Sequence, residues 1–166
     1  MPKRKPNRIE DYDYSRNGTY FVTICVKDMK QILGQIVDEN GSPIVGAPIG
    51  RPKIELSHIG KIIEEAICNI PEKYEDVSVD IYTIMPNHIH MIILIDRGRG
   101  RAVRAPTISQ IIGQMKGYVT KKLGYSIWQK LFWDHVIRNG KAYEKIWYYI
   151  DENPLKWELD EYYDKI

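Results

Sequence analysis

The eight residues His88–Ile95 read His-Ile-His-Met-Ile-Ile-Leu-Ile, and the other elements of the fold can be arranged around them. Their nearly continuous apolar character is typical of a strand that is buried on both faces and therefore central in its sheet. Met85-Pro86-Asn87 forms a turn before this strand, and Val77–Ile84 alternates well enough to be the strand that enters the turn. The two segments predict a pair of neighbouring strands.

Shorter runs rich in β-branched and aromatic residues predict the remaining strands. They lie at residues 19–26 and 31–37, with a short extended segment at 135–138. A turn at Asn40-Gly41 follows the second strand, and the Pro/Gly-rich stretch 44–52 is expected to be a loop.

Apolar residues at helical spacing predict the helices. The first helix is expected at 52–69, with Pro71 ending it. A second helix begins after Thr107, which forms a capping-box pattern with Gln110, and it stops at Gly124. The last helix is expected at 142–153 and stops before Pro154, because the residue before a proline is pushed out of the helical region.

This order of elements fits an α+β protein: a ferredoxin-like split βαβ sandwich with a central antiparallel sheet and an added C-terminal helix. With 166 residues the chain is expected to be a single domain over 1–166, in which 1–13 form a flexible basic arm and 155–166 a C-terminal tail. The two cysteines show no metal-binding spacing, and no apolar run has the length of a membrane span. The sequence therefore predicts a cytoplasmic protein with no membrane partner.

His88 and His90 carry most of the functional information. Side chains alternate along a strand, so both imidazoles are expected on one face. Two neutral imidazoles side by side on a rigid strand are half of a metal site. Histidines in strands are also often core residues held by hydrogen bonds, so the pair taken alone leaves both interpretations open.

Tyr149 and Asn153 lie one turn apart on one face of the last predicted helix. Tyr149 is the candidate nucleophile, because among the aromatic residues 147–149 only Tyr149 shares a face with Asn153. The alternative is that these aromatic residues all pack the helix against the core. A divalent ion held by His88, His90 and Asn153 would keep about three of six octahedral positions for a phosphate oxygen and water. The residues therefore predict attack of a phenol on a phosphodiester with Mg²⁺ or Mn²⁺ as cofactor.

Basic residues are concentrated in one part of the chain. Between Arg97 and Trp133 there are eight Lys or Arg and no Asp or Glu, whereas the whole chain has 24 basic and 22 acidic residues. The candidate nucleic-acid contacts in this stretch are Arg97, Arg99, Arg101, Arg104, Lys116, Lys121 and Lys122. The alternative is a solvated Arg/Gly loop followed by ordinary exposed lysines.

Two further residues are expected to support the site. His135 is expected to have a structural or substrate-orienting role rather than to bind the metal. Lys145 lies one turn before Tyr149, and its charge is expected to lower the pKa of the phenol.

Three blocks of the sequence resemble one protein family. His88-Ile89-His90 is similar to the HUH motif, in which two histidines flank a hydrophobic residue. The segments 132–139 (FWDHVIRN) and 149–154 (YIDENP) resemble blocks of the REP-associated tyrosine transposases, which are relatives of the single-tyrosine HUH transposases. The resemblance covers residues 14–157, although the stretch 44–52 matches no functional block of the family.

This resemblance implies that Tyr149 is the nucleophile, that His88 and His90 bind the metal, and that Asn153 is the third ligand. Members of the family cut single-stranded DNA beside a folded hairpin, form a 5′-phosphotyrosine, release a 3′-hydroxyl and rejoin strands without ATP. They act as monomers, or as homodimers in which the tyrosine helix is donated in trans. The resemblance therefore predicts an HUH-type tyrosine transposase, an endonuclease and strand transferase whose partner is a hairpin repeat.

Two other functions are compatible with the residues. The basic stretch and the twelve tyrosines would also suit a non-catalytic binding module for structured single-stranded nucleic acid. A two-histidine phosphoesterase ranks last, because that class needs two His-x-Ser/Thr motifs and this chain has one His-x-His.

Overall fold

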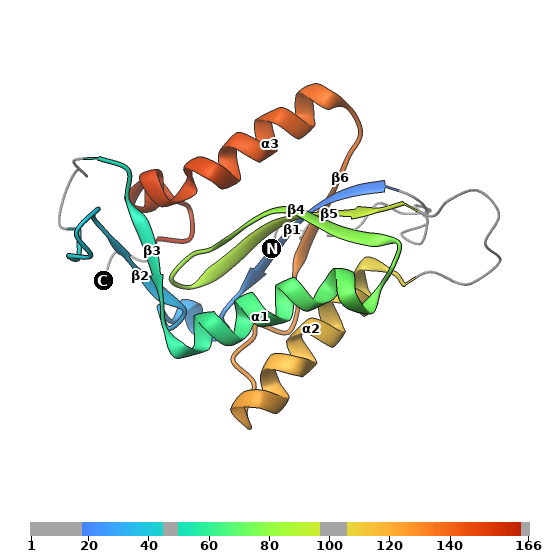
Figure 1. The fold of residues 1–166 in the computed structure, drawn as a ribbon, viewed down its shortest axis with the longest axis horizontal. Helices are drawn as coiled ribbons and strands as arrows, with labels where there is room; N and C mark the ends of the chain where they lie inside the picture. Colours follow the sequence, from blue (N-terminus) through green and yellow to red (C-terminus); the bar gives the residue numbers. More distant parts are fainter. Residues whose placement is uncertain (1–17, 45–49, 97–105, 164–166) are drawn as a thin grey trace, which may run out of the picture.

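The computed structural model describes residues 18–44, 50–96 and 106–163 (Figure 1). It contains both helices and strands, as expected for an α+β protein. In chain order the elements are β1 (Gly18–Cys25), a short 3-10 helix (Lys27–Met29), β2 (Gly34–Val37), β3 (Lys53–Leu56), α1 (His58–Lys73), β4 (Val77–Ile84), β5 (His88–Ile95), α2 (Ile108–Leu123), β6 (Trp133–Ile137), α3 (Gly140–Glu152) and the 3-10 helix η2 (Asn153–Leu159).

The central sheet has the strand order β4-β5-β1-β6, and every neighbouring pair in it is antiparallel. This order confirms the split βαβ sandwich, since β5 lies between β4 and β1. Strand β5 is buried along its length except at Leu94, as its apolar sequence predicts. Strands β2 and β3 pair with each other in a separate two-stranded sheet.

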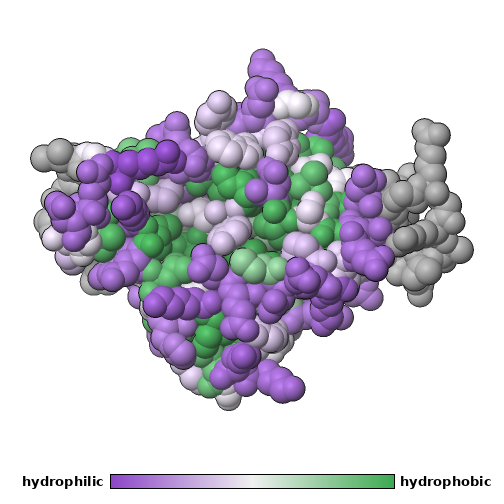
Figure 2. Space-filling model, in the orientation of Figure 1, coloured by the Kyte–Doolittle hydropathy of each residue, from purple (hydrophilic) through white to green (hydrophobic). Residues whose placement is uncertain are grey.

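Helices cover both faces of the central sheet. Figure 1 shows α1 and α2 on one side and α3 on the other. The larger hydrophobic core lies between the sheet and the α1/α2 layer, and a smaller cluster around Phe21, Ile92 and Ile150 packs α3 against the opposite face. On the face of the molecule shown in Figure 2, apolar side chains are visible mainly in the middle, between α3 and α1. The added C-terminal helix is therefore the element that encloses the second face of the sheet.

The predicted helix at 52–69 is wrong at both ends. Residues 53–56 form β3, whose apolar positions also satisfy a period of two. Helix α1 begins after Ser57, whose hydroxyl accepts a hydrogen bond from the backbone N–H of Gly60 at 3.1 Å. Pro71 lies inside the last turn and does not end the helix, which continues to Lys73.

The boundaries of the other two helices follow the sequence signals closely. Thr107 and Gln110 form the reciprocal capping box that begins α2, and Gly124 ends it with a left-handed φ of 80°. Asn139 caps α3 by accepting a hydrogen bond of 2.8 Å from the N–H of Ala142. After α3, however, the segment expected to be a tail continues as η2 and folds back toward the start of β5.

Among the described residues, no helix combines the length and the apolar character that are needed to cross a membrane.

Candidate active site

The imidazoles of His88 and His90 point to the same face of β5, as the alternation of side chains predicts, and this face is the one that α3 covers. Their Nε2 atoms lie 3.1 Å apart. The two side chains are 0% and 1% exposed, so both imidazoles are enclosed by the surrounding protein. The pair is therefore part of the protein core and also a convergent pair of nitrogen atoms.

Two neighbouring polar residues orient these imidazoles. The side-chain oxygen of Asn87 lies 2.8 Å from Nδ1 of His88, and because an amide oxygen only accepts, Nδ1 carries the proton. The hydroxyl of Thr23 lies 2.8 Å from Nδ1 of His90, its partner in the β1–β5 register. Such outer contacts fix the ring orientation and make the opposite nitrogen available as a ligand. Neither residue was predicted from the sequence; Thr23 could be found only once the strand register was known.

Helix α3 brings Tyr149 to the histidines. Its phenolic oxygen lies 3.3 Å from Nε2 of His90, and the two ring centroids are 5.2 Å apart. Tyr149 is 40% exposed, so one side of the phenol faces the pair while the other is open to solvent. The ring of the adjacent Tyr148 is 59% exposed and contacts Trp147. The structure therefore places Tyr149, rather than its aromatic neighbours, beside the histidine pair.

The surroundings of Tyr149 make its phenol a weaker acid. Burial raises its pKa to about 12, with smaller contributions in the same direction from Asp160 and Glu161. The side chain of Asn153 acts in the opposite direction. Lys145, which was expected to lower this pKa, is exposed and is not among the groups that shift it. The phenol is thus un-ionised at neutral pH and must lose its proton during any nucleophilic step.

Asn153 lies next to this group because the helical backbone continues through it, with φ −56° and ψ −41°. Its side chain is 2% exposed, and its Nδ2 donates a hydrogen bond of 2.8 Å to the carboxylate of Asp160. The other amide atom, Oδ1, is buried and finds no hydrogen-bond partner within the described part of the chain. A buried polar atom without a partner is costly, and a cation would satisfy it.

The donor atoms gathered here fit a divalent ion. The ligand atoms of His88, His90 and Asp160 all lie within 4.8 Å of one another. Two nitrogens bound to one ion at about 2.1 Å and at right angles are about 3 Å apart, which agrees with the 3.1 Å between the histidine nitrogens. Asp160 was not predicted from the sequence, because it follows a turn in what was expected to be a tail.

The protonation states of the two histidines and the charge of Asp160 also favour a bound metal ion. Burial lowers the pKa of His88 to about 4, against the opposing effects of the Asp160 carboxylate and the Asn153 side chain. Burial also holds the pKa of His90 well below its ordinary value, and proximity to His88 adds to this shift. Both imidazoles are therefore neutral at pH 7 and able to bind a metal, while Asp160 and Asn153 favour positive charge beside them.

The C-terminal segment covers the histidine pair. The ring of Tyr162 lies 4.6 Å from that of His88 and 5.8 Å from that of His90, and Trp157 lies 5.9 Å from His88. The backbone carbonyl of Tyr162 accepts a hydrogen bond of 2.7 Å from the side-chain amide of Asn87. The segment expected to be a tail is therefore, as far as residue 163, part of the site.

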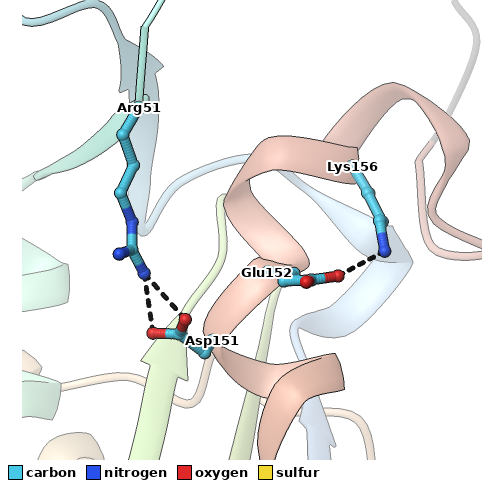
Figure 3. Close-up of polar contacts among 4 residues, drawn as sticks. All are labelled: Arg51, Asp151, Glu152 and Lys156. Atoms are coloured by element: carbon cyan, nitrogen blue, oxygen red, sulfur yellow. Dashed lines mark hydrogen bonds and ion pairs between the residues drawn. The ribbon is translucent and has the colours of Figure 1, made fainter.

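Two ion pairs are formed by acidic residues at the C-terminal end of α3. Arg51, just before β3, donates to both carboxylate oxygens of Asp151 at 2.8 Å, and Lys156 pairs with Glu152 (Figure 3). Asp151 lies two residues after Tyr149, so the first of these pairs joins the helix end that carries the tyrosine to the β2–β3 sheet. Exposed ion pairs contribute at most about 1 kcal/mol. Their main effect is to orient the helix end.

Of the predicted nucleic-acid contacts, the three lysines all lie on α2. Helix α2 lies across the sheet from α3 (Figure 1), and Lys122 on it pairs with Glu65 of α1 at 3.8 Å. Lys116 donates to the carbonyl of Gln129 at 3.0 Å, and Lys121 is exposed. The four arginines at 97–104 lie outside the described residues. His135 is exposed on β6, where its ring stacks on that of Trp133.

Comparisons with known proteins identify relatives. No protein-family model matches the sequence. A protein of Haemophilus influenzae with no characterised function is 31% identical over 180 residues, which cover 96% of this chain and 93% of that protein. A REP-associated tyrosine transposase of Escherichia coli is 32% identical over 144 residues, which cover 86% of this chain and 70% of the transposase.

A solved structure shares the fold. It is that of a REP-associated tyrosine transposase bound to a REP hairpin, and it superposes with a TM-score of 0.62 over 93% of this chain and 77% of its own. The two sequences are 22% identical in this comparison, so the likeness concerns the fold.

Proposed function

The chain belongs to the REP-associated tyrosine transposases, and on this basis we propose that it is a transposase that acts on single-stranded DNA folded into a hairpin repeat. The substrate class is supported by the relative of the same fold that is bound to a REP hairpin. The proposed reaction is metal-dependent cleavage and strand transfer through a 5′-phosphotyrosine.

One observation carries the proposal: the phenolic oxygen of Tyr149 and the Nε2 atoms of His88 and His90 converge on one point. The distances are 3.3 Å from Tyr149 to His90 and 3.1 Å between the histidines. A single imidazole nitrogen of His90 cannot satisfy both contacts, because it has either one proton or one lone pair. A cation bound by the two nitrogens would resolve this crowding.

We propose that His88, His90 and Asn153 hold a divalent ion, Mg²⁺ or Mn²⁺. The unpartnered Oδ1 of Asn153 supports its part in this set. Asp160 offers a carboxylate at the same place, and its negative charge favours a cation there. When bound, the ion would act as a Lewis acid on the phosphate and fix its orientation.

In the proposed step the phenolic oxygen of Tyr149 bonds to phosphorus while the bond from phosphorus to the O3′ of the preceding nucleotide breaks. The phenol loses its proton, and the leaving oxygen gains one to become a 3′-hydroxyl. The DNA is then joined to Tyr149 through its 5′-phosphate. Attack by the 3′-hydroxyl of another strand reverses the step and transfers the strand, and because one phosphodiester replaces another, no ATP is needed.

We also propose that the tyrosine acts in cis and that residues 1–166 form one domain. Tyr149 contacts His90 of its own chain. An enzyme whose tyrosine acted on the partner's histidines would not need this contact. The contacts of the C-terminal segment with β5 support the inclusion of this segment in the same domain.

The direct test is an adduct assay. The full chain is mixed with a DNA hairpin that carries single-stranded flanks, in Mn²⁺, in Mg²⁺ and in EDTA, and the products are separated under denaturing conditions. We expect a covalent protein–DNA band with either metal and none in EDTA. The alternative outcome is DNA binding that weakens with salt, is unchanged by EDTA and gives no adduct. It would support the non-catalytic binding module.

A further inference from the structure

An exposed pair of aromatic rings lies on the sheet beside the candidate nucleophile. The rings of Trp133 and His135 stack with an interplanar angle of 7° and a centroid separation of 5.8 Å. Trp133 is 40% exposed, and His135 is exposed as well. Large aromatic side chains are usually covered, so a stacked and exposed pair is a candidate contact surface.

The strand geometry of β6 produces this pair. Alternation places Trp133, His135 and Ile137 on the face that α3 covers, and it buries Asp134 and Val136 on the opposite face. Ile137 belongs to the cluster beneath α3, whereas Trp133 and His135 lie nearer the start of the strand and remain exposed. The only carboxylate of β6 is thus directed away from the exposed rings.

Phe21 connects these rings to the candidate active site. It lies opposite His135 in the β1–β6 register. Its ring contacts that of Trp133 at 5.5 Å, that of Tyr149 at 6.1 Å and that of His90 at 5.3 Å. A DNA strand whose phosphate reaches Tyr149 therefore passes within reach of Trp133.

We propose that Trp133 and His135 form a stacking platform for a nucleobase close to the scissile phosphate. The inference rests on the proposed function for its ligand, single-stranded DNA, and adds a base-binding site to it. Bases stack on aromatic rings through their π faces, so such a platform accepts any base and positions the strand without reading its sequence. Lys130 and Arg138 are exposed on either side of β6, where cationic side chains suit the flanking phosphates.

The platform predicts a coupling between one side chain and one nucleotide. The probe is a fluorescently labelled DNA hairpin with single-stranded flanks, and its binding is measured by anisotropy with the full chain carrying Tyr149→Phe, so that no strand is cut. Trp133→Ala should weaken binding about 5- to 150-fold, the range expected for one base–aromatic stack. Trp133→Phe should retain most of the affinity. Tyr125→Ala, which removes another exposed aromatic ring, is the matched control and should bind like the parent.

A scan of abasic sites along the flanks then locates the base. At one nucleotide the abasic substitution should weaken binding by the parent but cause no further loss with Trp133→Ala. Thermal unfolding of each variant shows whether the fold is intact, and the comparison of intact with abasic DNA remains valid for a destabilised variant. Equal binding by Trp133→Ala and Tyr125→Ala, or additive losses at every nucleotide, would overturn the platform. Failure of the adduct assay would overturn the proposed catalysis and leave this binding result unaffected.

Discussion

The phenolic oxygen of Tyr149 lies 3.3 Å from Nε2 of His90, although 59 positions separate the two residues in the chain. The contact forms because α3 packs on the face of the sheet to which the histidines point. Part of the site is thus carried by a central strand and part by the end of a surface helix.

Replacing Tyr149 or Tyr148 by Phe removes one phenolic oxygen and shows which of the two adjacent tyrosines is the nucleophile. Tyr149→Phe should reduce adduct formation by on the order of 10³-fold or more, because no nucleophile remains. Tyr148→Phe deletes the same atom one position away, where the ring contacts Trp147. This variant should form the adduct at the parental rate in the denaturing-gel assay. If Tyr148→Phe abolished the adduct and Tyr149→Phe did not, Tyr148 would be the nucleophile instead.

The two candidate oxygen ligands should respond differently to DNA. In the free protein, Asn153→Ala and Asp160→Asn should each weaken Mn²⁺ binding by about 10- to 100-fold, measured by electron paramagnetic resonance titration. A bound phosphate brings a negatively charged oxygen to the ion, so it can compensate for the charge lost in Asp160→Asn better than for the neutral amide lost in Asn153→Ala. With hairpin DNA present, the loss in Asp160→Asn should therefore shrink, and that in Asn153→Ala should persist. Unchanged Mn²⁺ affinity in Asn153→Ala would exclude it as a ligand.

Access to the histidines should depend on Tyr162. Its ring lies 4.6 Å from His88, so Tyr162→Ala should uncover the imidazole and speed its modification by diethylpyrocarbonate several-fold. Tyr163→Ala is the control, since the Tyr163 ring contacts Trp157. We also expect faster adduct formation in Tyr162→Ala, because DNA no longer has to displace the ring. Equal modification rates in both variants would show that Tyr162 does not cover the site.

Acid should destabilise the metal-free protein before it protonates exposed carboxylates. Burial lowers the pKa of His88 to about 4 from 6.5, so between these values the unfolded chain binds the additional proton. The free energy of unfolding should be unaffected above pH 6.5 and fall as the pH drops toward 4, by on the order of 3 kcal/mol. Denaturant titrations in EDTA measure this loss. It should be smaller in His88→Gln, and a flat profile from pH 7 to 4.5 would contradict the prediction.

Gly60 should be far less tolerant of a side chain than the glycines of α2. A Cβ at Gly60 would lie 2.1 Å from the carbonyl oxygen of Leu33, so Gly60→Ala forces α1 away from its neighbour. We expect a loss of about 3 kcal/mol in the free energy of unfolding. A Cβ at Gly117 meets nothing within 4 Å, and Gly117→Ala should stabilise the protein by about 1 kcal/mol. Equal stabilities of the two variants would contradict this account.

The sequence predicted the parts of the fold whose signals are local. The apolar run of β5, the capping box at Thr107 and the Gly124 stop each act within a few residues, and each prediction is confirmed. The family resemblance, carried by short blocks of residues, is confirmed by the Escherichia coli relative. Strand β3 was missed because Ile54 and Leu56 also fit the helical pattern that continues into α1.

The rest of the site depends on long-range pairing. Thr23 becomes a partner of His90 only through the β1–β5 register, and Asp160 approaches the histidines only because η2 turns the chain back. Local sequence patterns do not predict the distance between segments that are far apart in the chain. The i, i+4 relation of Tyr149 and Asn153 could be predicted because it lies within one helix.

The burial of His88 and His90 bears on how copies of this gene decay. Both imidazoles fill the interior and are held by polar neighbours, so their loss damages folding as well as chemistry. Tyr149 is 40% exposed near the end of α3, so its replacement should cost less stability than the loss of either buried histidine. Lineages that stop moving DNA but still use the protein should lose the tyrosine first and retain the histidines. With Tyr149 as the proposed nucleophile, we therefore expect an intact tyrosine to mark an active copy better than the histidines do.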